Sequence, residues 1–398
     1  MSGPLAGIRV VEYAQYVAGP FAGSLLAELG AEVIKVEPPG GDSYRRVMPV
    51  ASGVGRYFVP LNRGKRSVVL DLKTPEGLER SRALVATADI VLHNFRPNRE
   101  ISFGLAWECL RVLSPRVVAG VVTSFGPEGP LAGAPAYDLV AQARSGLLTT
   151  NASPGDTVPT RAGGLPMADL TAGFLLATGV LAALVRARET GVGERVEVPL
   201  LAAALAVQVQ DMVWLEGEQV DEVARPASRS DLRARADEIG LGLATNPYYR
   251  CYEALDGFLA VACLNLAQRQ AFIGVFGLED STIEAPDLIP DDAGLVERKR
   301  AVTGEIAARI SMEPVDGWLS RLGAARVPCG PVLARETVHA DPQVRANGLL
   351  AEIDQPGLGA VKMLGRLFRI GDGARDAVGP APVLGADTDD VLAELEAS

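Results

Sequence analysis

Side chains that act as general bases or metal ligands are scarce in this chain of 398 residues. It contains two histidines, His93 and His339, and four cysteines without C-x-x-C spacing. A metal site built on several histidines is therefore excluded, and a Ser-His-Asp triad would have to use one of these two. His93 ends an apolar run and His339 lies in a polar stretch, so we interpret both as structural residues. Any catalysis must work with few histidines or none.

Basic residues gather in one segment of an otherwise acidic chain. The net charge is −11, which argues against non-specific binding of nucleic acid. Residues 56–99 nevertheless contain nine basic and four acidic residues, a net charge of +5. One interpretation is a set of solvated surface charges. The other is a basic mouth at the ends of parallel strands, which would attract a small ligand with several phosphates.

Three short motifs with possible chemistry are set aside. Gly191-Val-Gly193 follows a predicted helix and precedes a strand, which is the reverse of a dinucleotide-binding loop. Gly64–Ser67 lacks the upstream glycine of a P-loop and leads into a strand. The chain also has no G-x-S-x-G sequence, the turn that carries the nucleophile of α/β-hydrolases.

The chain reads as a cytoplasmic protein without a membrane segment. Its first residues lack a basic stretch followed by an apolar one, so they are not typical of a signal peptide. The longest apolar run, 170–185, is shorter than the roughly 20 residues that span a bilayer and predicts a buried helix. We interpret the four cysteines as buried, reduced thiols.

Strands and helices alternate over the first 200 residues, which predicts an α/β domain with a parallel sheet covered by helices on both faces. Thr74-Pro75-Glu76 places an N-cap, an N1 proline and an acidic first turn before one of these helices. The predicted strands are 8–13, 32–37, 67–72, 90–94, 117–123 and 195–198, and the predicted helices are 21–29, 75–86, 167–188 and 200–215.

The composition changes after residue 215, which suggests a second domain. The charged stretch 216–239 reads as a linker or an exposed helix. Asp256-Gly257 lies between two apolar runs and predicts a β-hairpin. We therefore expect a large α/β domain over 1–215, a linker over 216–239, a small α+β domain over 240–330 and a C-terminal segment over 331–398.

Several short motifs, in this order along nearly the whole chain, resemble the class III CoA-transferases, a family that includes formyl-CoA transferase, carnitine CoA-transferases and α-methylacyl-CoA racemases. The motifs are Gly7–Glu12, Ala18–Pro20, Leu29–Glu37, Asn62–Ser67, Leu70–Lys73, Asn94–Pro97, Tyr137-Asp138, Pro166–Asp169, Thr190–Arg195, Asp341–Gln343 and Leu384–Thr388. The resemblance implies a Rossmann-like large domain, joined through two linkers to the small one, a C-terminal segment that returns to the large domain, and an interlocked homodimer.

The resemblance also implies a catalytic residue. Asp169 matches the family's aspartate, which attacks an acyl-CoA thioester as a carboxylate and forms a covalent aspartyl intermediate. A free aspartate has a pKa near 3.9 and needs no general base at neutral pH. Without the resemblance, an acid at the positive end of a predicted helix is sufficiently explained by the helix dipole.

Coenzyme A enters as a substrate, and no permanently bound cofactor or metal is expected. The positions that match CoA contacts in relatives are Val17, Ala18, Leu70, Asp71, Leu72, Lys73, Asn94, Phe95, Arg96 and Tyr137. Pro38, Ser102 and Pro135 stand where relatives carry basic residues, and Arg99 or Lys65 could compensate for them. The glycine-rich loop of formyl-CoA transferase is absent from 240–249, which argues against formate and oxalate as substrates.

The function expected from these residues is transfer of CoA from an acyl-CoA to a carboxylic acid. The first alternative is a 2-methylacyl-CoA racemase, which needs an acid–base pair next to the thioester. Racemases of this family carry a histidine where this chain has Tyr137, and a phenol with a pKa near 10 is a poor base. The second alternative is a CoA-binding protein without catalytic activity.

Overall fold

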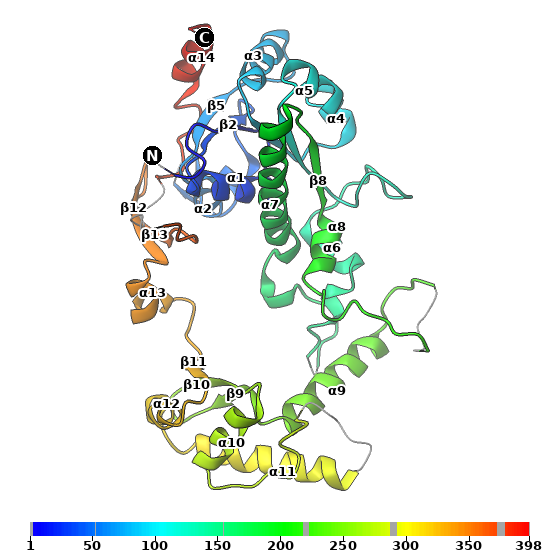
Figure 1. Ribbon diagram of the computed structural model, residues 1–398, viewed down its shortest axis with the longest axis vertical. Coiled ribbons are helices and arrows are strands. Elements are labelled where there is room, and N and C mark those ends of the chain that lie inside the picture. The colour runs from blue at the N-terminus through cyan, green and yellow to red at the C-terminus, as the bar shows by residue number, and fades with distance from the viewer. Residues whose placement is uncertain are drawn as a thin grey trace. The chain divides into compact units, whose positions relative to one another are not determined.

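The computed structural model describes residues 3–51, 53–153, 155–217, 223–286, 293–371 and 379–397, with only the main chain of Ala162. The chain divides into two compact units (Figure 1). The first comprises Met1–Leu148, Arg161–Glu222 and Pro342–Ser398. The second comprises Thr149–Thr160 and Val223–Asp341.

A six-stranded sheet forms the centre of the first unit. Its order is β5-β2-β1-β6-β7-β8, and every neighbouring pair is parallel, which confirms the predicted parallel sheet. The order reverses between β1 and β6, as in doubly wound folds, where ligands bind beyond the carboxyl ends of the strands. The strands are β1 (Arg9–Glu12), β2 (Glu32–Glu37), β5 (Arg66–Val69), β6 (Ile90–His93), β7 (Val118–Thr123) and β8 (Arg195–Pro199).

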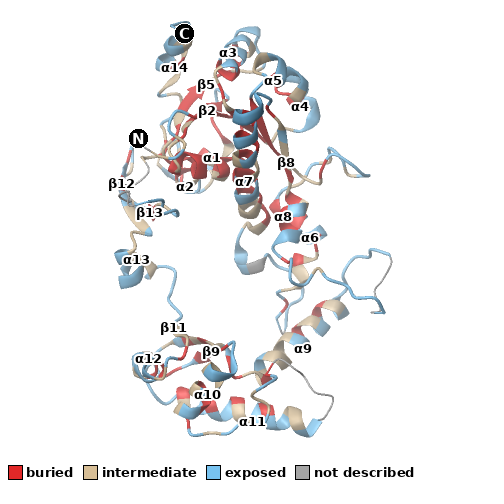
Figure 2. Ribbon diagram, in the orientation of Figure 1, coloured by how far each residue is buried: buried red, intermediate tan, exposed pale blue. Residues whose placement is uncertain are grey.

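Helices cover both faces of this sheet and leave its strands buried between two apolar layers (Figure 2). One face packs against α1 (Ala18–Glu28), α7 (Met167–Thr190) and α8 (Leu200–Ala206). The other face packs against α3 (Pro75–Ala86), α5 (Trp107–Leu113) and α14 (Thr388–Glu396). The predicted N-cap of α3 is present, because the Thr74 hydroxyl accepts a hydrogen bond from the Gly77 amide.

Helix α7 crosses the sheet in close contact with α1. A Cβ atom at Gly173 would lie 2.9 Å from the carbonyl oxygen of Ala18 and 2.8 Å from the Phe21 ring, so only glycine permits this approach. By length and composition α7 is the one helix among the described residues that could cross a membrane. Its packing against α1 and the sheet is that of a core helix, as predicted for this run.

Two expectations are wrong: one concerns the length of a helix in the first unit, and the other concerns the burial of the cysteines. The helix predicted over 200–215 ends at Ala206, because only its first turns reach the core and Val207, Val209 and Val213 are β-branched residues that favour helix weakly. All four cysteines are free, but of the four expected to be buried only Cys263 is: Cys329 is half-buried, and Cys109 and Cys251 are exposed. The alternation of strand β9 turns Cys251 away from the core, since its neighbour Tyr252 points inward.

The second unit combines a three-stranded antiparallel sheet with helices. The hairpin predicted around Asp256-Gly257 joins β9 to β10, and β11 pairs with the other edge of β10. Its core includes Tyr248, Phe272 and Trp318. The elements are α9 (Arg229–Thr245), β9 (Tyr249–Glu253), β10 (Phe258–Ala262), α10 (Leu266–Val275), α11 (Ala293–Ile310), α12 (Val315–Ala324), β11 (Cys329–Pro331) and the 3₁₀ turn η4 (Val338–Ala340).

Of the C-terminal segment expected over 331–398, the part Pro342–Ser398 belongs to the first unit, while residues 331–341 belong to the second. The start of its last helix, α14, is bonded to β5: the Ser67 amide donates to the Asp387 carboxylate and the Val69 amide to the Thr388 hydroxyl. Ile353 and Met363 of its hairpin pack on Phe58. The remaining elements of this unit are η1 (Ser43–Arg46), β3 (Pro49–Ala51), β4 (Val54–Gly55), α2 (Phe58–Asn62), α4 (Pro97–Ser102), α6 (Asp138–Arg144), η2 (Leu147–Thr149), η3 (Ala162–Gly164), α13 (Pro342–Ala346), β12 (Leu350–Gln355) and β13 (Gly359–Leu364).

Candidate active site

The candidate site begins where the strand order reverses, at the ends of β1 and β6. The Asn94 side chain joins the two ends: its Oδ1 accepts from the Gln15 amide at 3.1 Å and its Nδ2 donates to the Gln15 carbonyl at 2.8 Å. Helix α1 starts at Ala18, directly after the β1 loop. Two hollows open beside this point, and both are lined by Phe95 and Arg99.

The smaller hollow, of about 250 Å³, is lined by half of the ten residues predicted to contact CoA. The loop after β5 supplies one wall and the loop after β6 the other. Arg99 lies over the Phe103 ring at 5.6 Å, and Pro38 lines the hollow at the end of β2. The predicted residues in its lining are Leu70, Asp71, Leu72, Lys73 and Phe95.

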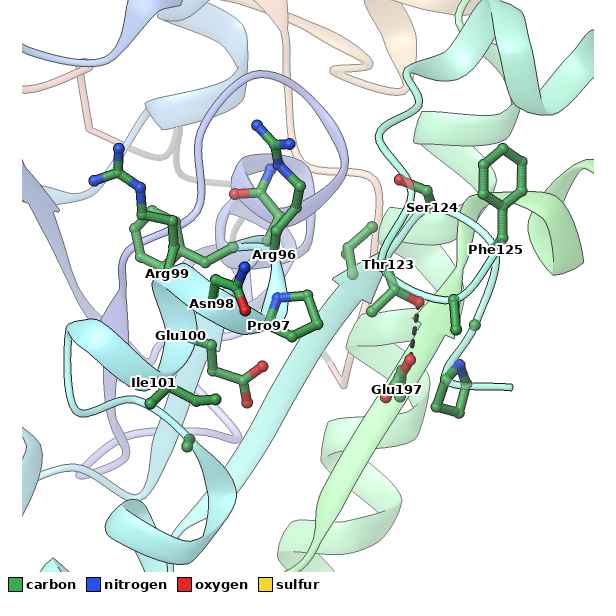
Figure 3. Close-up of a pocket in the computed structure, with 18 of the residues that line it drawn as sticks. Arg96, Pro97, Asn98, Arg99, Glu100, Ile101, Thr123, Ser124, Phe125 and Glu197 are labelled. Atoms are coloured by element: carbon green, nitrogen blue, oxygen red, sulfur yellow. Dashed lines mark hydrogen bonds between the residues drawn. The ribbon is translucent and has the colours of Figure 1, made fainter. Parts of the chain in front are cut away.

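The larger hollow, of about 1020 Å³, lies between α4 and the loop after β7. The predicted residues Asn94 and Arg96 line it together with Arg99. Figure 3 shows the guanidinium groups of Arg96 and Arg99 at one end and the carboxylates of Glu100 and Glu197 at the other. Glu197 accepts a hydrogen bond from the Thr123 hydroxyl at 3.0 Å, and Arg195 pairs with both carboxylates. The basic end is therefore the one suited to phosphate groups.

The structure corrects the picture of a continuous basic mouth over 56–99. Lys65 is buried, with its ammonium group bonded to both Glu12 carboxylate oxygens, the Asn62 side chain and two carbonyls. Arg63 is also buried and pairs with Glu28. Lys73, Arg96 and Arg99 are exposed at the hollows. Of the two residues expected to compensate for missing contacts, only Arg99 reaches a hollow.

Asp169 lies in the first turn of α7, outside the residues that line the two hollows. Its amide donates to Asp138 Oδ1 at 3.3 Å, and the Ala168 amide donates to the same oxygen at 2.9 Å. Burial, together with the charge of Asp138, raises the pKa of Asp169 to about 7. Its carboxyl is therefore half protonated near neutral pH, in place of the full ionisation expected of a free aspartate.

Three tyrosines, Tyr16, Tyr44 and Tyr137, pack together near Asp169 and near the point where the strand order reverses. Of these, only Tyr137 was expected as a site residue. The ring of Tyr16 packs edge-on against Tyr44 at 5.7 Å and against Tyr137 at 5.4 Å. Burial raises the pKa of Tyr44, and the charge of Asp169 raises it further. Tyr16 has a φ of 72°, a left-handed conformation that is uncommon outside glycine and that no sequence pattern announces.

A buried set of charges holds the loops that carry these tyrosines. Asp42 Oδ1 accepts from the amide of Tyr44 at 2.9 Å and from that of Tyr16 at 3.5 Å. Its other oxygen lies 2.9 Å from Lys35 Nζ, and Lys35 also pairs with Glu12. All three charged side chains are fully enclosed. They place Tyr16 and Tyr44 at the end of β1 and β2 rather than taking part in chemistry themselves.

Of the remaining predicted residues, Val17 and Ala18 follow Tyr16 in the chain, and Tyr137 packs on its ring. Val17 and Ala18 are buried at the start of α1. Tyr137 is exposed. His93 is fully buried, and burial lowers its pKa to about 3, while His339 lies exposed in η4. No set of three or more His, Cys, Asp or Glu side chains among the described residues could hold a metal ion.

Comparison with known proteins gives a consistent result. A family model described as CoA-transferase family III matches residues 5–388. A succinate–glutarate CoA-transferase of Agrobacterium fabrum is 35% identical, with 99% of this chain and 96% of that protein covered. A human succinyl-CoA:glutarate CoA-transferase is 29% identical over 98% of this chain and 86% of its own. The crystal structure of a CAIB/BAIF family protein from Brucella suis is 29% identical, with a TM-score of 0.78 over 99% of this chain and 100% of that one.

Proposed function

This chain belongs to CoA-transferase family III, and from that premise we propose that it moves CoA between an acyl-CoA and a carboxylic acid through a covalent intermediate on Asp169. The observation that carries the proposal is the carboxyl of Asp169 at the start of α7, half-buried and beside Asp138. Burial and the like charge make this carboxylate more basic than an exposed one, and a more basic carboxylate is a stronger nucleophile.

The reaction balances without any further reagent. An Asp169 carboxylate oxygen attacks the thioester carbonyl carbon, which expels CoA thiolate and leaves a mixed anhydride. The thiolate then attacks the aspartyl carbonyl, which releases the donor acid and forms an aspartyl-CoA thioester. The acceptor carboxylate attacks this thioester and expels CoA thiolate, which leaves a mixed anhydride of the acceptor and Asp169. The thiolate then attacks the acceptor's carbonyl carbon, which forms the acceptor's CoA thioester and frees the Asp169 carboxylate.

We place the nucleotide of CoA in the smaller hollow and the basic end of the larger one. Two observations support this position. The hollows meet at Phe95 and Arg99, at the strand reversal where such sheets bind ligands. Lys73, Arg96 and Arg99 supply exposed cations for phosphate groups. Tyr16 follows Gln15, which lines the smaller hollow, and its ring packs on Tyr44, which is close enough to Asp169 for the charge of that carboxyl to raise the pKa of Tyr44.

The substrates that we propose are short dicarboxylic acids and their CoA thioesters. Relatives that resemble most of this chain are named for succinate and glutarate, and others for oxalate and malate. Glutarate and succinate are the first acceptors to test, with succinyl-CoA as the donor. A cytoplasmic location stays a prediction.

We also propose a homodimer. Helix α7 buries one face against α1 and the sheet, while Phe174, Leu175 and Val185 remain exposed in the single chain. Val213, Trp214 and Leu215 add exposed apolar side chains after α8. Contiguous exposed apolar surface marks protein interfaces, so we take these side chains as the candidate contact surface. A mass measured by light scattering that equals one chain of 41.8 kDa would contradict the dimer.

Mass spectrometry of the intact protein tests the covalent step. Incubation with succinyl-CoA followed by hydroxylamine should convert Asp169 to a hydroxamate in the wild type. Asp169→Asn should show neither the modification nor CoA exchange, while Glu189→Gln, at the exposed far end of α7, should show both. Exchange that persists in Asp169→Asn would overturn the assignment of the nucleophile. Binding of CoA without an acyl-enzyme for any thioester would favour the inactive CoA-binding protein.

A further inference from the structure

The first turn of α7 is capped by a side chain from another helix. The residue at the N-cap position, Pro166, has no side chain able to accept a hydrogen bond, and none is made there. Asp138, the first residue of α6, fills this role with Oδ1, which accepts from the amides of Ala168 and Asp169. Unpaired amides at a helix start are normally satisfied by a nearby side-chain oxygen or by water. The cap therefore fixes the main chain of Asp169 itself.

Asp138 is held in turn by a buried partner. Its side chain is 6% exposed, and Oδ2 accepts from Gln142 Nε2 at 2.7 Å. Gln142 is completely buried and also donates to the Leu165 carbonyl at 3.1 Å, just before the start of α7. The pair thus links α6 to the loop that leads into α7 and leaves Asp138 little freedom to move.

We propose that Asp138 is a positioning residue for Asp169, which it serves by capping α7 and by placing a second negative charge beside the nucleophile. The inference rests on the proposed role of Asp169 as the nucleophile. Asp138 has no assigned part in the covalent steps, since its two oxygens are occupied by the Ala168, Asp169 and Gln142 donors.

Burial is the larger contribution to the basicity of Asp169, and the second contribution is the charge of Asp138. Together they raise the pKa of Asp169 to about 7. Tyr44 faces Asp169 from η1, and Arg161 acts on both Tyr44 and Asp138. Helix α1, which packs along α7, carries one titratable residue, Glu28, at its opposite end. Removing the charge of Asp138 should therefore make Asp169 ionise at lower pH and attack more slowly once ionised.

Two substitutions separate the cap from the charge. Asp138→Asn keeps an oxygen that can accept from the α7 amides but removes the charge, whereas Asp138→Ala removes both. Glu189→Gln removes one exposed carboxylate from the far end of the same helix and is the matched control. The measurements are the pH dependence of acyl-enzyme formation in a single turnover with succinyl-CoA, the KM for succinyl-CoA and the melting temperature.

For Asp138→Asn we expect the acid limb of the profile to move down by about one pH unit and the plateau rate to fall severalfold. For Asp138→Ala we expect a loss of about 100-fold in the rate, with KM within about threefold of the wild type. A merely structural role would lower the rate equally at every pH. If Asp138→Ala does not fold, the Asn variant still decides the question through the position of its acid limb.

Failure of the inference on Asp138 can be distinguished from failure of the proposed function. Unchanged profiles for both Asp138 variants, together with an inactive Asp169→Asn, would overturn this inference and leave the proposed function intact. Acyl-enzyme formation by Asp169→Asn would overturn the proposed function and this inference with it. A rise in KM that accounts for the whole loss in Asp138→Ala would assign the residue to substrate binding and would also overturn the inference.

Discussion

Lys65 and Glu12 form an ion pair in the core, with Nζ 2.8 Å from Oε2 and both side chains fully shielded from solvent. Glu12 ends β1, and Lys65 precedes β5 two strands away. The ammonium group also contacts the carbonyl of Pro20 in the first turn of α1. The pair therefore ties the loop after β1, which carries Tyr16, to the edge of the sheet.

Lys65→Met should destabilise the protein strongly. Removing the ammonium group takes one of two cations from the buried Glu12 carboxylate, which keeps Lys35, and leaves the Asn62 side chain and two carbonyls without this donor. We therefore expect the free energy of unfolding to fall by about 3 kcal/mol. Urea denaturation measures this change. Arg80→Met is the control: it breaks an exposed pair with Glu76 and should alter the free energy of unfolding by about 0.5 kcal/mol or less. Equal effects would contradict the role given to the buried pair.

The rate of acyl-enzyme formation should rise with pH through a midpoint near 7. The reactive form of Asp169 is its carboxylate, and the pKa of this group is raised to about 7 by burial and by Asp138. Quenched-flow mass spectrometry between pH 5 and 9 measures the rate without product release. A rate that is flat from about pH 5 upward would mean that the pKa of Asp169 is that of an ordinary aspartate.

Asp169→Asn should be more stable than the wild type at alkaline pH. The folded pKa of Asp169 lies above the unfolded value, so ionisation disfavours the folded state. This penalty is absent below about pH 4, grows as the pH rises toward 7 and is complete above it. We expect a gain of about 1–2 kcal/mol at pH 8, since the half-buried carboxyl retains contact with solvent. Melting curves at pH 5 and 8 measure the gain in stability over the wild type. A gain that is larger at pH 5 than at pH 8 would contradict the predicted pH dependence.

Affinity for CoA should depend on salt. CoA carries about four negative charges, and exposed cations are screened within about 10 Å at 0.1 M salt. We expect the affinity to fall about three- to tenfold between 50 and 300 mM salt, measured by calorimetry. Charge reversal at Lys73, Arg96 or Arg99 should raise the KM for acyl-CoA more than it lowers kcat. Charge reversal at Arg300, which is exposed on α11 of the second unit, should change neither KM nor kcat. If the variants at Lys73, Arg96 and Arg99 all keep the KM of the wild type, CoA binds elsewhere.

Racemase activity should be absent. Removing a proton beside the thioester needs a base, and the hydrogen bond between the Tyr137 and Tyr16 side chains raises the pKa of Tyr137 above its already high value. A 2-methylacyl-CoA incubated in D₂O should therefore gain no deuterium at Cα, measured by mass spectrometry, while CoA exchange proceeds. Deuterium uptake without exchange would reverse the order of the two candidate functions.

The local sequence determined most of the secondary structure, because the signals it uses are short-range. Alternating and β-branched runs gave β2 its predicted bounds, and Thr74-Pro75-Glu76 gave α3 its cap. The order of strands and helices was enough to predict a parallel sheet with covered faces. The motifs that resemble CoA-transferases likewise identified the family, which the comparisons confirm.

The tertiary structure alone decided which of these residues meet and how they are charged. Lys65 and Lys73 look alike in the sequence, but the fold buries the first against Glu12 and leaves the second at a hollow. The pKa of Asp169 depends on a carboxylate 31 residues away and on burial, neither of which a local pattern encodes. Desolvation and contact between distant segments arise only when the chain is packed, so the sequence by itself indicated Asp169 as the candidate nucleophile and the structure decided the environment of its carboxyl group.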